Sequence, residues 1–412
     1  MTKIFLTGAL TACLLLTGCG SDSASVDAET IDLKSKAASK LVTMGVGAEM
    51  SAEESVSPEK SATKRQIDWD GAPRFDNFDA LVEYLNTCKK NLQTWQPVVC
   101  VNGFKPDSGK IVNIRPMQWM QWTDYGNGRI LYELTNYPGE RVAYAYTHGD
   151  TSFLSDEERR LYDTAVKIVN EAKNFSSDAL YQELYIHDAI AERAEYYTEN
   201  PQPKLARFQT ATGALLDGRA NCQGYSDAFY MLATMCGLDV DKVGGYANND
   251  SHVWNTVNFG DGSYFVDVTW NDGKCILNDV PYNTYIYFNA PTDVIGSDHR
   301  WNTAHVPQNL QGVPDGRNFY HSMAYQNSGG RYFGAWSQTA EDALGHIAYR
   351  IANQGYKVSW VEAPYNATYA DVNNALNYVL NDLSNRGWSG SVSMTVQPCG
   401  NRLYYTAKAI RN

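Results

Sequence analysis

The sequence predicts an α+β fold, in which helices and antiparallel strands alternate along a chain of 412 residues. Segments with apolar residues at helical spacing are followed by short runs in which apolar residues occupy every second position. The hydrophobic content of 43%, of which many residues are aromatic, supports packed cores. The length allows two or three domains. We expect a globular protein in which smaller α/β modules flank a central one.

The N-terminus is typical of a secretory signal peptide. Lys3 provides one positive charge, and the mostly apolar run over 4–16 is too short to span a bilayer. The segment 16–19 reads Leu-Thr-Gly-Cys and resembles a bacterial lipobox. That resemblance implies cleavage after residue 18 and lipidation of the Cys19 sulfur.

A polar segment over 20–64 follows, rich in Ser, Ala, Glu and Lys, with almost no aromatic residues. Such a composition is typical of a flexible spacer. We therefore expect a signal peptide over 1–18 and a lipidated tether over 19–70. The body would lie outside the cytoplasm, in the bacterial cell envelope, and the lipid on Cys19 would anchor it to a membrane.

The charge of the chain argues against nucleic-acid binding. The formal net charge is −12, and loss of residues 1–18 removes one lysine and no acid, which makes it −13. Phosphate contacts need clustered Lys and Arg, and no basic stripe is visible in the sequence. We expect no nucleic-acid partner.

Six of the eight cysteines remain after signal cleavage and lipidation. They are Cys88, Cys100, Cys222, Cys236, Cys275 and Cys399. No CxxC pair occurs, so we expect no structural zinc site. If Cys222 is a working thiol, five others are left, and at least one of these is unpaired. Cys236 suits that role, and the pairing of the other four stays open.

The region before the central module is predicted as an α/β module over 71–150. It holds an amphipathic helix over 78–92 and a strand over 98–101. Strands over 129–135 and 141–147 are predicted to form a hairpin, because Pro followed by Gly at 138–139 is a turn signal.

A central module over 151–312 begins with a capping box, in which Ser155 caps a helix and Glu158 closes the box. Helices are predicted over 156–174 and 178–197. A C-terminal α/β module over 313–412 would hold helices over 338–353 and 368–384, a strand over 356–361 and a final hairpin. Its order resembles that of 76–148, which indicates either two related modules or ordinary α+β architecture without homology.

The central module carries the residues with chemical potential, beginning with Cys222. A turn containing Gly218 leads into it, and apolar positions after it recur at helical spacing. Cys222 therefore lies at a helix N-terminus, where unpaired amides and the helix dipole favour thiolate over thiol. The thiolate is the nucleophilic form of cysteine.

His252 and Asp267 follow on two predicted strands, joined by a turn at 260–262. Side by side on adjacent antiparallel strands, both would face the helix that bears Cys222. A cysteine, a histidine that takes its proton and a carboxylate that orients the histidine together perform acyl transfer.

The segments 218–229, 252–255 and 267–270 resemble the three core motifs of the transglutaminase-like superfamily. Segments 187–197 and 287–299 resemble the helix before the nucleophile and the segment after the third motif in that family. The resemblance covers about 155–300. It implies a papain-like core, with the nucleophile helix packed on an antiparallel sheet.

The resemblance also implies roles for the three residues: Cys222 as nucleophile, His252 as base and Asp267 as the orienting acid. It implies no metal and no organic cofactor. The Cys222 amide would be one oxyanion donor, and Gln209 and Gln223 are candidates for the second. We expect Trp254 and Trp270 to pack beside the triad. Tyr225 and His187 are expected to be structural.

The acceptor of the acyl group decides the reaction. Water makes the enzyme a cysteine protease or amidase, and a primary amine makes it a protein-crosslinking transglutaminase. We expect hydrolysis of peptide or amide bonds through a thioester, with a protein or a cell-wall peptide as substrate. The alternative class is a non-enzymatic binding or assembly lipoprotein that retains the fold.

Overall fold

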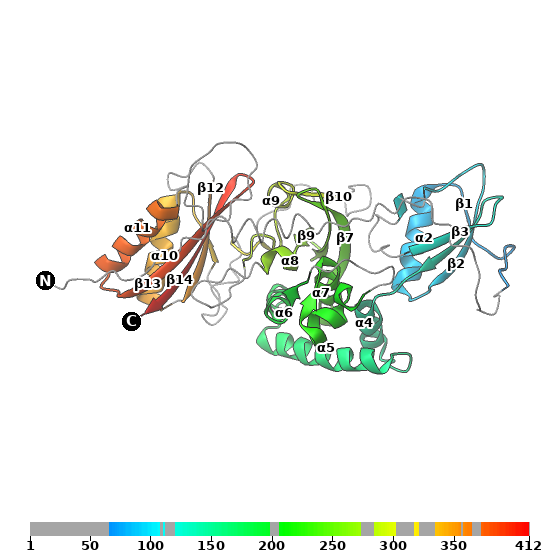
Figure 1. Ribbon diagram of the computed structural model, residues 1–412, viewed down its shortest axis with the longest axis horizontal. Coiled ribbons are helices and arrows are strands. Elements are labelled where there is room, and N and C mark those ends of the chain that lie inside the picture. The colour runs from blue at the N-terminus through cyan, green and yellow to red at the C-terminus, as the bar shows by residue number, and fades with distance from the viewer. Residues whose placement is uncertain are drawn as a thin grey trace.

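The computed structural model describes residues 66–107, 110–111, 120–197, 206–272, 284–301, 317–320, 334–355, 357–364 and 372–411. Helices and three four-stranded sheets succeed one another in them, so the fold is α+β as predicted. Figure 1 shows one sheet toward each end of the molecule and the third between them, beside a group of helices. Cys19 and Cys275 lie outside the described residues.

The N-terminal unit is one sheet with a helix on it. Its elements are β1 (Arg74–Phe75), α2 (Phe78–Lys90), β2 (Trp95–Cys100), β3 (Met120–Asp124) and β4 (Arg129–Leu134), with sheet order β1-β2-β4-β3. The Asn77 side chain accepts a hydrogen bond from the Ala80 amide at 2.9 Å and so begins α2. The buried side of α2, including Leu81 and Leu85, packs on the sheet through Val98 and Tyr132.

The central unit combines four long helices with the second sheet. The long helices are α4 (Pro138–His148), α5 (Asp156–Phe175), α6 (Ala179–Arg193) and α7 (Cys222–Cys236). The strands are β7 (Asp239–Ala247), β8 (Asp250–Asn258), β9 (Ser263–Val266) and β10 (His299–Trp301), in the order β10-β7-β8-β9. The short elements are β5 (Glu195–Tyr196), η1 (Arg207–Gln209), η2 (Gly213–Asp217), β6 (Arg219–Ala220), α8 (Val268–Asn271) and α9 (Thr292–Ile295).

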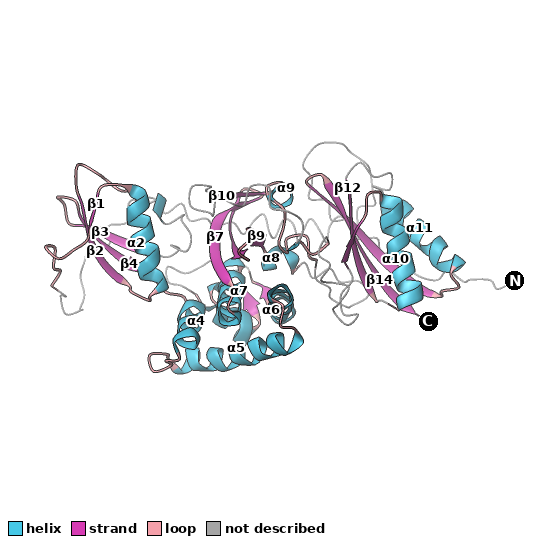
Figure 2. Ribbon diagram, turned by 180° about the vertical axis from the view of Figure 1, so that it is seen from behind, coloured by secondary structure: helices cyan, strands magenta, loops and turns pink. Residues whose placement is uncertain are grey.

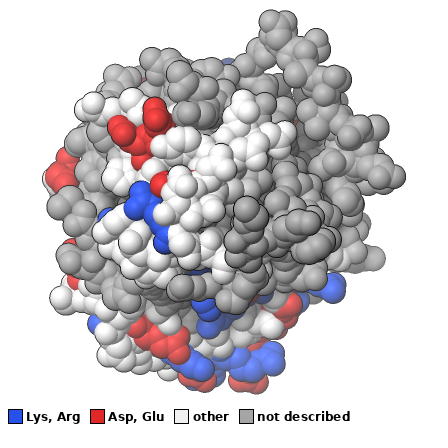
Figure 3. Space-filling view, turned by 90° about the vertical axis from the view of Figure 1, so that its left-hand side faces the viewer, with Lys and Arg blue, Asp and Glu red and all other residues white. Residues whose placement is uncertain are grey.

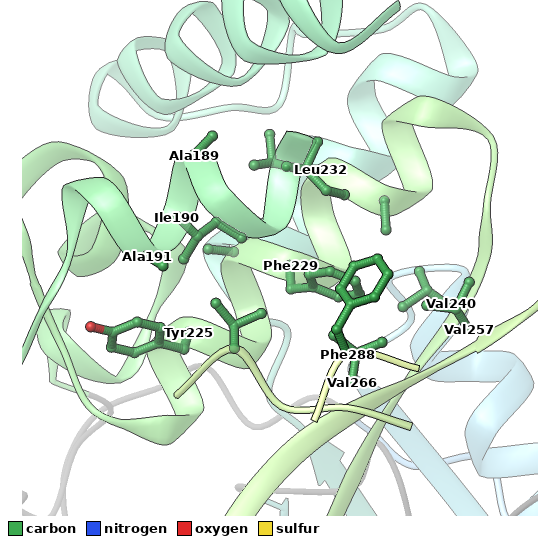
Figure 4. Packing of buried hydrophobic residues seen from close by; sticks show 14 of the residues in the cluster. Ala189, Ile190, Ala191, Tyr225, Phe229, Leu232, Val240, Val257, Val266 and Phe288 are labelled. Carbon is green, nitrogen blue, oxygen red and sulfur yellow. The ribbon is translucent and has the colours of Figure 1, made fainter. Parts of the chain in front are cut away.

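Helix α7 is the centre of this unit, since it contacts α4, α5 and α6 as well as β7 and β8. Phe229 and Leu232 on α7 are fully buried, as Figure 4 shows, with Ile190 of α6 nearby. Val240 and Val257, on neighbouring strands of the sheet, belong to the same core. This packing holds the first turn of α7 in place against the sheet.

The C-terminal unit is a sheet with two helices on one face, as Figure 2 shows for α10 and α11. Its elements are β11 (Gly334–Trp336), α10 (Ala340–Gln354), β12 (Val358–Pro364), α11 (Val372–Asn385), β13 (Gly390–Cys399) and β14 (Arg402–Arg411), with sheet order β11-β12-β14-β13. The predicted final hairpin is confirmed, because β13 pairs antiparallel with β14 from Gly390 to Arg411.

The two outer sheets have the same topology. In each, the first strand pairs parallel with the second, the second pairs antiparallel with the fourth, and the third pairs antiparallel with the fourth. A helix connects the first two strands in both cases. The two outer units are therefore alike in three dimensions, although the hairpin in the first is β3–β4 and not the predicted pair over 129–135 and 141–147. Common ancestry and the predicted domain boundaries stay predictions.

One predicted hairpin is wrong, because residues 138–148 form helix α4 and not a strand. Pro138 occupies the first helical position, where its missing amide costs no hydrogen bond. The Glu140 carboxylate accepts the Tyr137 amide at 2.9 Å, which closes the helix start. The Pro-Gly pair begins a helix here and does not form a turn.

Two further boundaries differ from prediction. Helix α6 ends at Arg193, four residues earlier than expected, since Glu195 and Tyr196 pair with β6. Asp267 does not lie in a strand, because β9 ends at Val266 and the Asp267 side chain caps α8. The first difference arises from a contact with a distant part of the chain, and the second from a local helix cap.

The described cysteines form no disulfide: Cys88, Cys100, Cys222, Cys236 and Cys399 are all free thiols. Among the described residues, no helix is both long and apolar enough to cross a bilayer. On the face shown in Figure 3, acidic and basic side chains lie interspersed.

Candidate active site

Cys222 is the first residue of α7, as predicted. The Asn221 side chain caps the helix by accepting the amides of Gln223 at 3.1 Å and Gly224 at 3.3 Å. This cap does not use the Cys222 amide, which stays with the positive end of the helix dipole beside the thiol. The Cys222 residue is 8% exposed.

The approach to α7 is tight, and a glycine makes it possible. A Cβ added at Gly224 would lie 2.5 Å from the Phe208 carbonyl oxygen and 2.9 Å from the Ala220 side chain. The segment that carries Phe208 therefore lies directly against the first turn of the helix. We infer that glycine at 224 is required for this packing.

His252 lies in β8, opposite Gly245 of β7. A Cβ at Gly245 would come within 2.1 Å of the Arg300 carbonyl oxygen and 2.8 Å of the Trp254 ring. Gly245 thus lets β10 pair closely with β7, and β10 begins with His299. The sheet in this way brings two histidines from different strands to one place.

The structure brings His252 and Asp267 into contact. His252 Nε2 lies 2.7 Å from Asp267 Oδ2, and the two residues are 6% and 1% exposed. The Cys222 side chain contributes to the raised pKa of His252. Since Nε2 faces the carboxylate, Nδ1 is the ring nitrogen that is left for the thiol.

The electrostatics of the group favour a charged imidazole. Burial disfavours the charged ring, but the charge of Asp267, the hydrogen bond that the ring donates to it and the nearby Cys222 outweigh burial and raise the pKa of His252 to about 10. Burial likewise opposes ionisation of Asp267, yet the charges and hydrogen bonds of two histidines hold its pKa well below its usual range. The carboxylate is therefore ionised and the imidazole protonated at neutral pH.

A second histidine, His299, contacts the same carboxylate. Its Nε2 lies 3.1 Å from Asp267 Oδ2, and its Nδ1 lies 2.5 Å from Asp298 Oδ1. The Tyr287 hydroxyl donates to the other oxygen of Asp298 at 2.6 Å. The sequence showed His299 only as part of a family-like segment, and its distance from Asp267 along the chain concealed the contact.

Aromatic rings enclose the two histidines, as expected for Trp254 and Trp270. Their ring centroids lie 5.7 and 5.9 Å from that of His252, and 5.0 and 4.6 Å from that of His299. Such walls exclude water and strengthen the charge interactions inside them.

Tyr196 is a neighbour of Cys222 that the sequence did not reveal. Tyr196 of β5 pairs with Ala220 of β6, and Ala220 lies two residues before Cys222 in the sequence. Burial raises the pKa of Tyr196, and the nearby Cys222 contributes through its charge and a side-chain hydrogen bond. The phenol was hidden because residues up to 197 were predicted to be helical.

Other expected roles can be compared with their contacts. The Gln209 side chain accepts the Ala206 amide at 2.8 Å and thereby stabilises its own short helix. The Tyr225 hydroxyl is hydrogen-bonded to Asp272, and His187 is fully buried between Asp188 and Asn271. Tyr225 and His187 are structural, as predicted.

One group in the described ranges has the composition of a metal site: His252, Asp267 and His299, whose donor atoms lie within 4.8 Å of one another. The hydrogen bonds of 2.7 and 3.1 Å to Asp267 account for the positions of both imidazoles without an ion. We therefore treat the group as a hydrogen-bonded cluster, called the triad cluster below: Cys222, His252, Asp267, His299 and Asp298.

Comparison with known proteins gives a match to a family described as the transglutaminase-like superfamily, over residues 164–269. Human (Homo sapiens) kyphoscoliosis peptidase is 24% identical over 229 residues, which cover 47% of this chain and 34% of that protein. The chain thus spans about a third of the length of that curated relative.

Two solved structures are also similar to this chain. One is described as a TGase, with 14% identity, a TM-score of 0.26, and coverage of 52% of this chain and 62% of that one. The other is the periplasmic domain of TgpA from Pseudomonas aeruginosa, with 14% identity, a TM-score of 0.24, and coverage of 37% of this chain and 63% of that one.

The matched range contains Cys222, His252 and Asp267, together with the helix and the strands that bring them together. Residues 164–269 are therefore similar to the transglutaminase-like superfamily.

Proposed function

We propose that the protein is an extracytoplasmic thiol acyl-transfer enzyme that hydrolyses peptide or amide bonds. Cys222 is the nucleophile, His252 the general base and acid, and Asp267 the residue that orients His252. A protein or a cell-wall peptide is the substrate, and a lipid on Cys19 anchors the enzyme to a membrane of the bacterial cell envelope.

The observation that supports this proposal best is the line of contacts from carboxylate to imidazole to thiol. Asp267 holds His252 at 2.7 Å by Nε2, and the other side of the ring meets the Cys222 thiol at a helix N-terminus. A buried imidazolium beside a thiol favours the ion pair of thiolate and imidazolium. A structural cysteine needs none of these groups.

The reaction follows from these positions. In the resting ion pair His252 already carries the proton from Cys222, and the thiolate attacks the carbonyl carbon while the Cys222 amide donates to the developing oxyanion. His252 then gives the proton to the departing amine, the C–N bond breaks, and a thioester remains. Water, deprotonated by His252, attacks the thioester, and the acid leaves as the thiol re-forms.

The first test is selective alkylation, with Cys236 at the other end of α7 as the matched control. Burial raises the pKa of Cys236 to about 11, although it is less buried than Cys222. Exposure alone would make Cys236 the faster thiol. We expect iodoacetamide near pH 7 to modify Cys222 first, as measured by peptide mass spectrometry. Faster modification of Cys236 would contradict the proposal.

The second test identifies the acceptor. Purified protein is incubated with casein, with and without a labelled primary amine, beside a Cys222→Ala variant. We expect Cys222-dependent cleavage or deamidation of the casein without incorporation of the amine. Incorporation that depends on Cys222 would make the protein a transglutaminase. Suppose that Cys222→Ala leaves cellular function intact and that substitutions elsewhere on the surface abolish it. That result would favour a non-enzymatic binding protein.

Anchoring is tested separately. Cells that express the chain are fed a labelled fatty acid, and we expect label on the protein and its recovery with membranes. A Cys19→Ser variant should lose both. Label that persists in this variant would contradict lipidation at Cys19.

A further inference from the structure

We propose that His299, held by Asp298, is a positioning residue of the active site that acts on His252 through Asp267. This inference rests on the proposed function, since it assigns a role within the same site. It extends the triad by a second imidazole and a second carboxylate, neither of which is needed to make the sheet.

The geometry supports the role because both imidazoles contact the same oxygen. His252 Nε2 and His299 Nε2 lie 2.7 and 3.1 Å from Asp267 Oδ2. The other oxygen, Oδ1, accepts the Trp270 amide at 3.2 Å. Three donors from three segments therefore hold one carboxylate, and its direction toward His252 is determined by all of them.

The hydrogen-bonding capacity of His299 fits a bridge between two carboxyl groups. Its two ring nitrogens both face carboxylate oxygens, of Asp267 and Asp298. Each ring nitrogen of a histidine can take part in a hydrogen bond. His299 therefore links Asp267 to Asp298 through one ring.

The surroundings of His299 provide no competing partner in the part of the chain that the structure describes. Asp267 and Asp298 supply the charges, and the hydroxyl of Tyr287 supports Asp298. The remaining close groups are rings: His252 at 5.5 Å between centroids, Trp254 at 5.0 Å and Trp270 at 4.6 Å. His299 is fully buried among them.

Two consequences follow for the reaction. His299 shares the negative charge of Asp267, which limits how strongly Asp267 retains the proton on His252. It also prevents rotation of the carboxylate when His252 gives up that proton. Both effects concern the proton transfers of His252, so they should alter turnover and its pH dependence, and leave substrate binding nearly unchanged.

The experiment compares His299→Ala and His299→Gln with the wild type and with His187→Gln. His187 is the matched control, because it is also fully buried and hydrogen-bonded to a neighbouring aspartate, Asp188 at 3.0 Å. Two probes are used: the rate of Cys222 alkylation by iodoacetamide from pH 4 to 10, and turnover of p-nitrophenyl acetate.

We expect His299→Ala to lower kcat for the ester about tenfold or more, with KM within about twofold, since one hydrogen bond to a charged group is lost. His299 contributes to the low pKa of Asp267, so its loss raises that pKa. A carboxylate that is more easily protonated orients His252 less well, so the rate of Cys222 alkylation at the acidic end of the range should fall relative to the wild type. The Gln variant keeps an N–H donor and should recover part of both effects.

Identical pH profiles and ester turnover in wild type, His299→Ala and His299→Gln would overturn the proposal. A stoichiometric transition metal in the wild type, lost in these variants together with activity, would also overturn it. If the Ala variant does not fold, His299→Gln and Asp298→Asn decide the question by the same readouts. A wild type without ester turnover refutes the proposed function, and the alkylation profiles still test His299.

Discussion

Helix α7 contributes to two buried groups of charges, and their difference separates stability from chemistry. The triad cluster surrounds its first residue, Cys222. One and a half turns later, Asp227 belongs to a second group, called the lysine cluster here: Lys89, Glu140, Asp227 and Lys242. Both groups are almost completely shielded from solvent.

In the lysine cluster, two positive charges meet two negative ones at 2.7 to 2.9 Å. The backbone supplies the remaining partners: the amides of Gly139 and Ala211 donate to Asp227, and the Thr135 carbonyl accepts from Lys89. Burial opposes every charge, but the nearby opposite charges lower the pKa of Glu140 and raise that of Lys242. This cluster joins α2, α4, α7 and β7 into one body.

In the triad cluster, charged and polar groups likewise surround a buried carboxylate, Asp267, but the group at the edge of the cluster is different. Its outermost member is the thiol of Cys222, which under the proposed function forms a bond to a substrate carbon. The lysine cluster has no such atom. Buried charges therefore indicate function only where a reactive group completes the network, and otherwise they connect structural elements.

The largest expected effect is a loss of enzymatic activity when the triad cluster is altered. Cys222→Ala should lower acyl transfer about ten-thousandfold, since the nucleophile is gone. The free energy of unfolding should change little, because a small buried side chain is replaced by a smaller one. Cys236→Ala serves as the control and should retain activity. Equal activity of the two variants would mean that Cys222 is not the nucleophile.

The next effect concerns stability. Lys242→Met leaves Lys89 to face both Glu140 and Asp227 and removes the ion pair of Asp227, and should lower the free energy of unfolding by about 3 to 5 kcal/mol in urea titrations. Alkylation of Cys222 should persist in the fraction that is folded. A loss below about 1 kcal/mol would show that the cluster is replaceable by apolar packing.

Asp267→Asn should lower turnover about a hundredfold or more. The amide has no negative charge to stabilise the protonated ring of His252, and it does not hold that ring in the correct orientation. The wild-type pKa of His252 is raised to about 10, so the imidazolium is present below that pH and is lost as the pH rises through it. In Asp267→Asn, the pH at which His252 loses its proton should move down toward the ordinary pKa of histidine. An unchanged limit would exclude Asp267 as its cause.

The same shifts define when the His252–Asp267 pair stabilises the fold. Since the folded-state pKa of His252 is raised, its contribution is complete below about pH 6.5 and disappears as the pH rises through about 10. The folded-state pKa of Asp267 is lowered, so its contribution is present above about pH 3.9 and is lost on acidification below it. Urea midpoints of wild type and Asp267→Asn should differ most between these limits.

The smallest effect is the control for the lysine cluster. Lys90 is adjacent to Lys89 in sequence, but its ammonium group is 3.9 Å from Asp241 and its side chain is 52% exposed. Lys90→Met should change the free energy of unfolding by less than about 1 kcal/mol. A loss as large as that of Lys242→Met would mean that burial does not distinguish the two lysines.

Local patterns were sufficient for much of this fold. Helices α5 and α7 begin where Ser155 and Asn221 provide caps, and the last hairpin forms at its predicted turn. The Pro-Gly pair at 138–139 led to the wrong prediction of a hairpin, because the same two residues suit either a β-turn or the start of a helix. The contact that decides between them, Glu140 with two lysines, comes from residues far away in the chain.

By itself, the sequence determined the α+β class and the placement of Cys222 at a helix start, and it predicted that His252 and Asp267 lie together. These follow from periodicity, caps and the order of elements, which are local properties. Tertiary structure alone decided that His299 and Tyr196 join the site and that the Lys89 side chain is buried. Such contacts depend on which strands pair and how closely the chain approaches itself, and no spacing in the sequence encodes that distance.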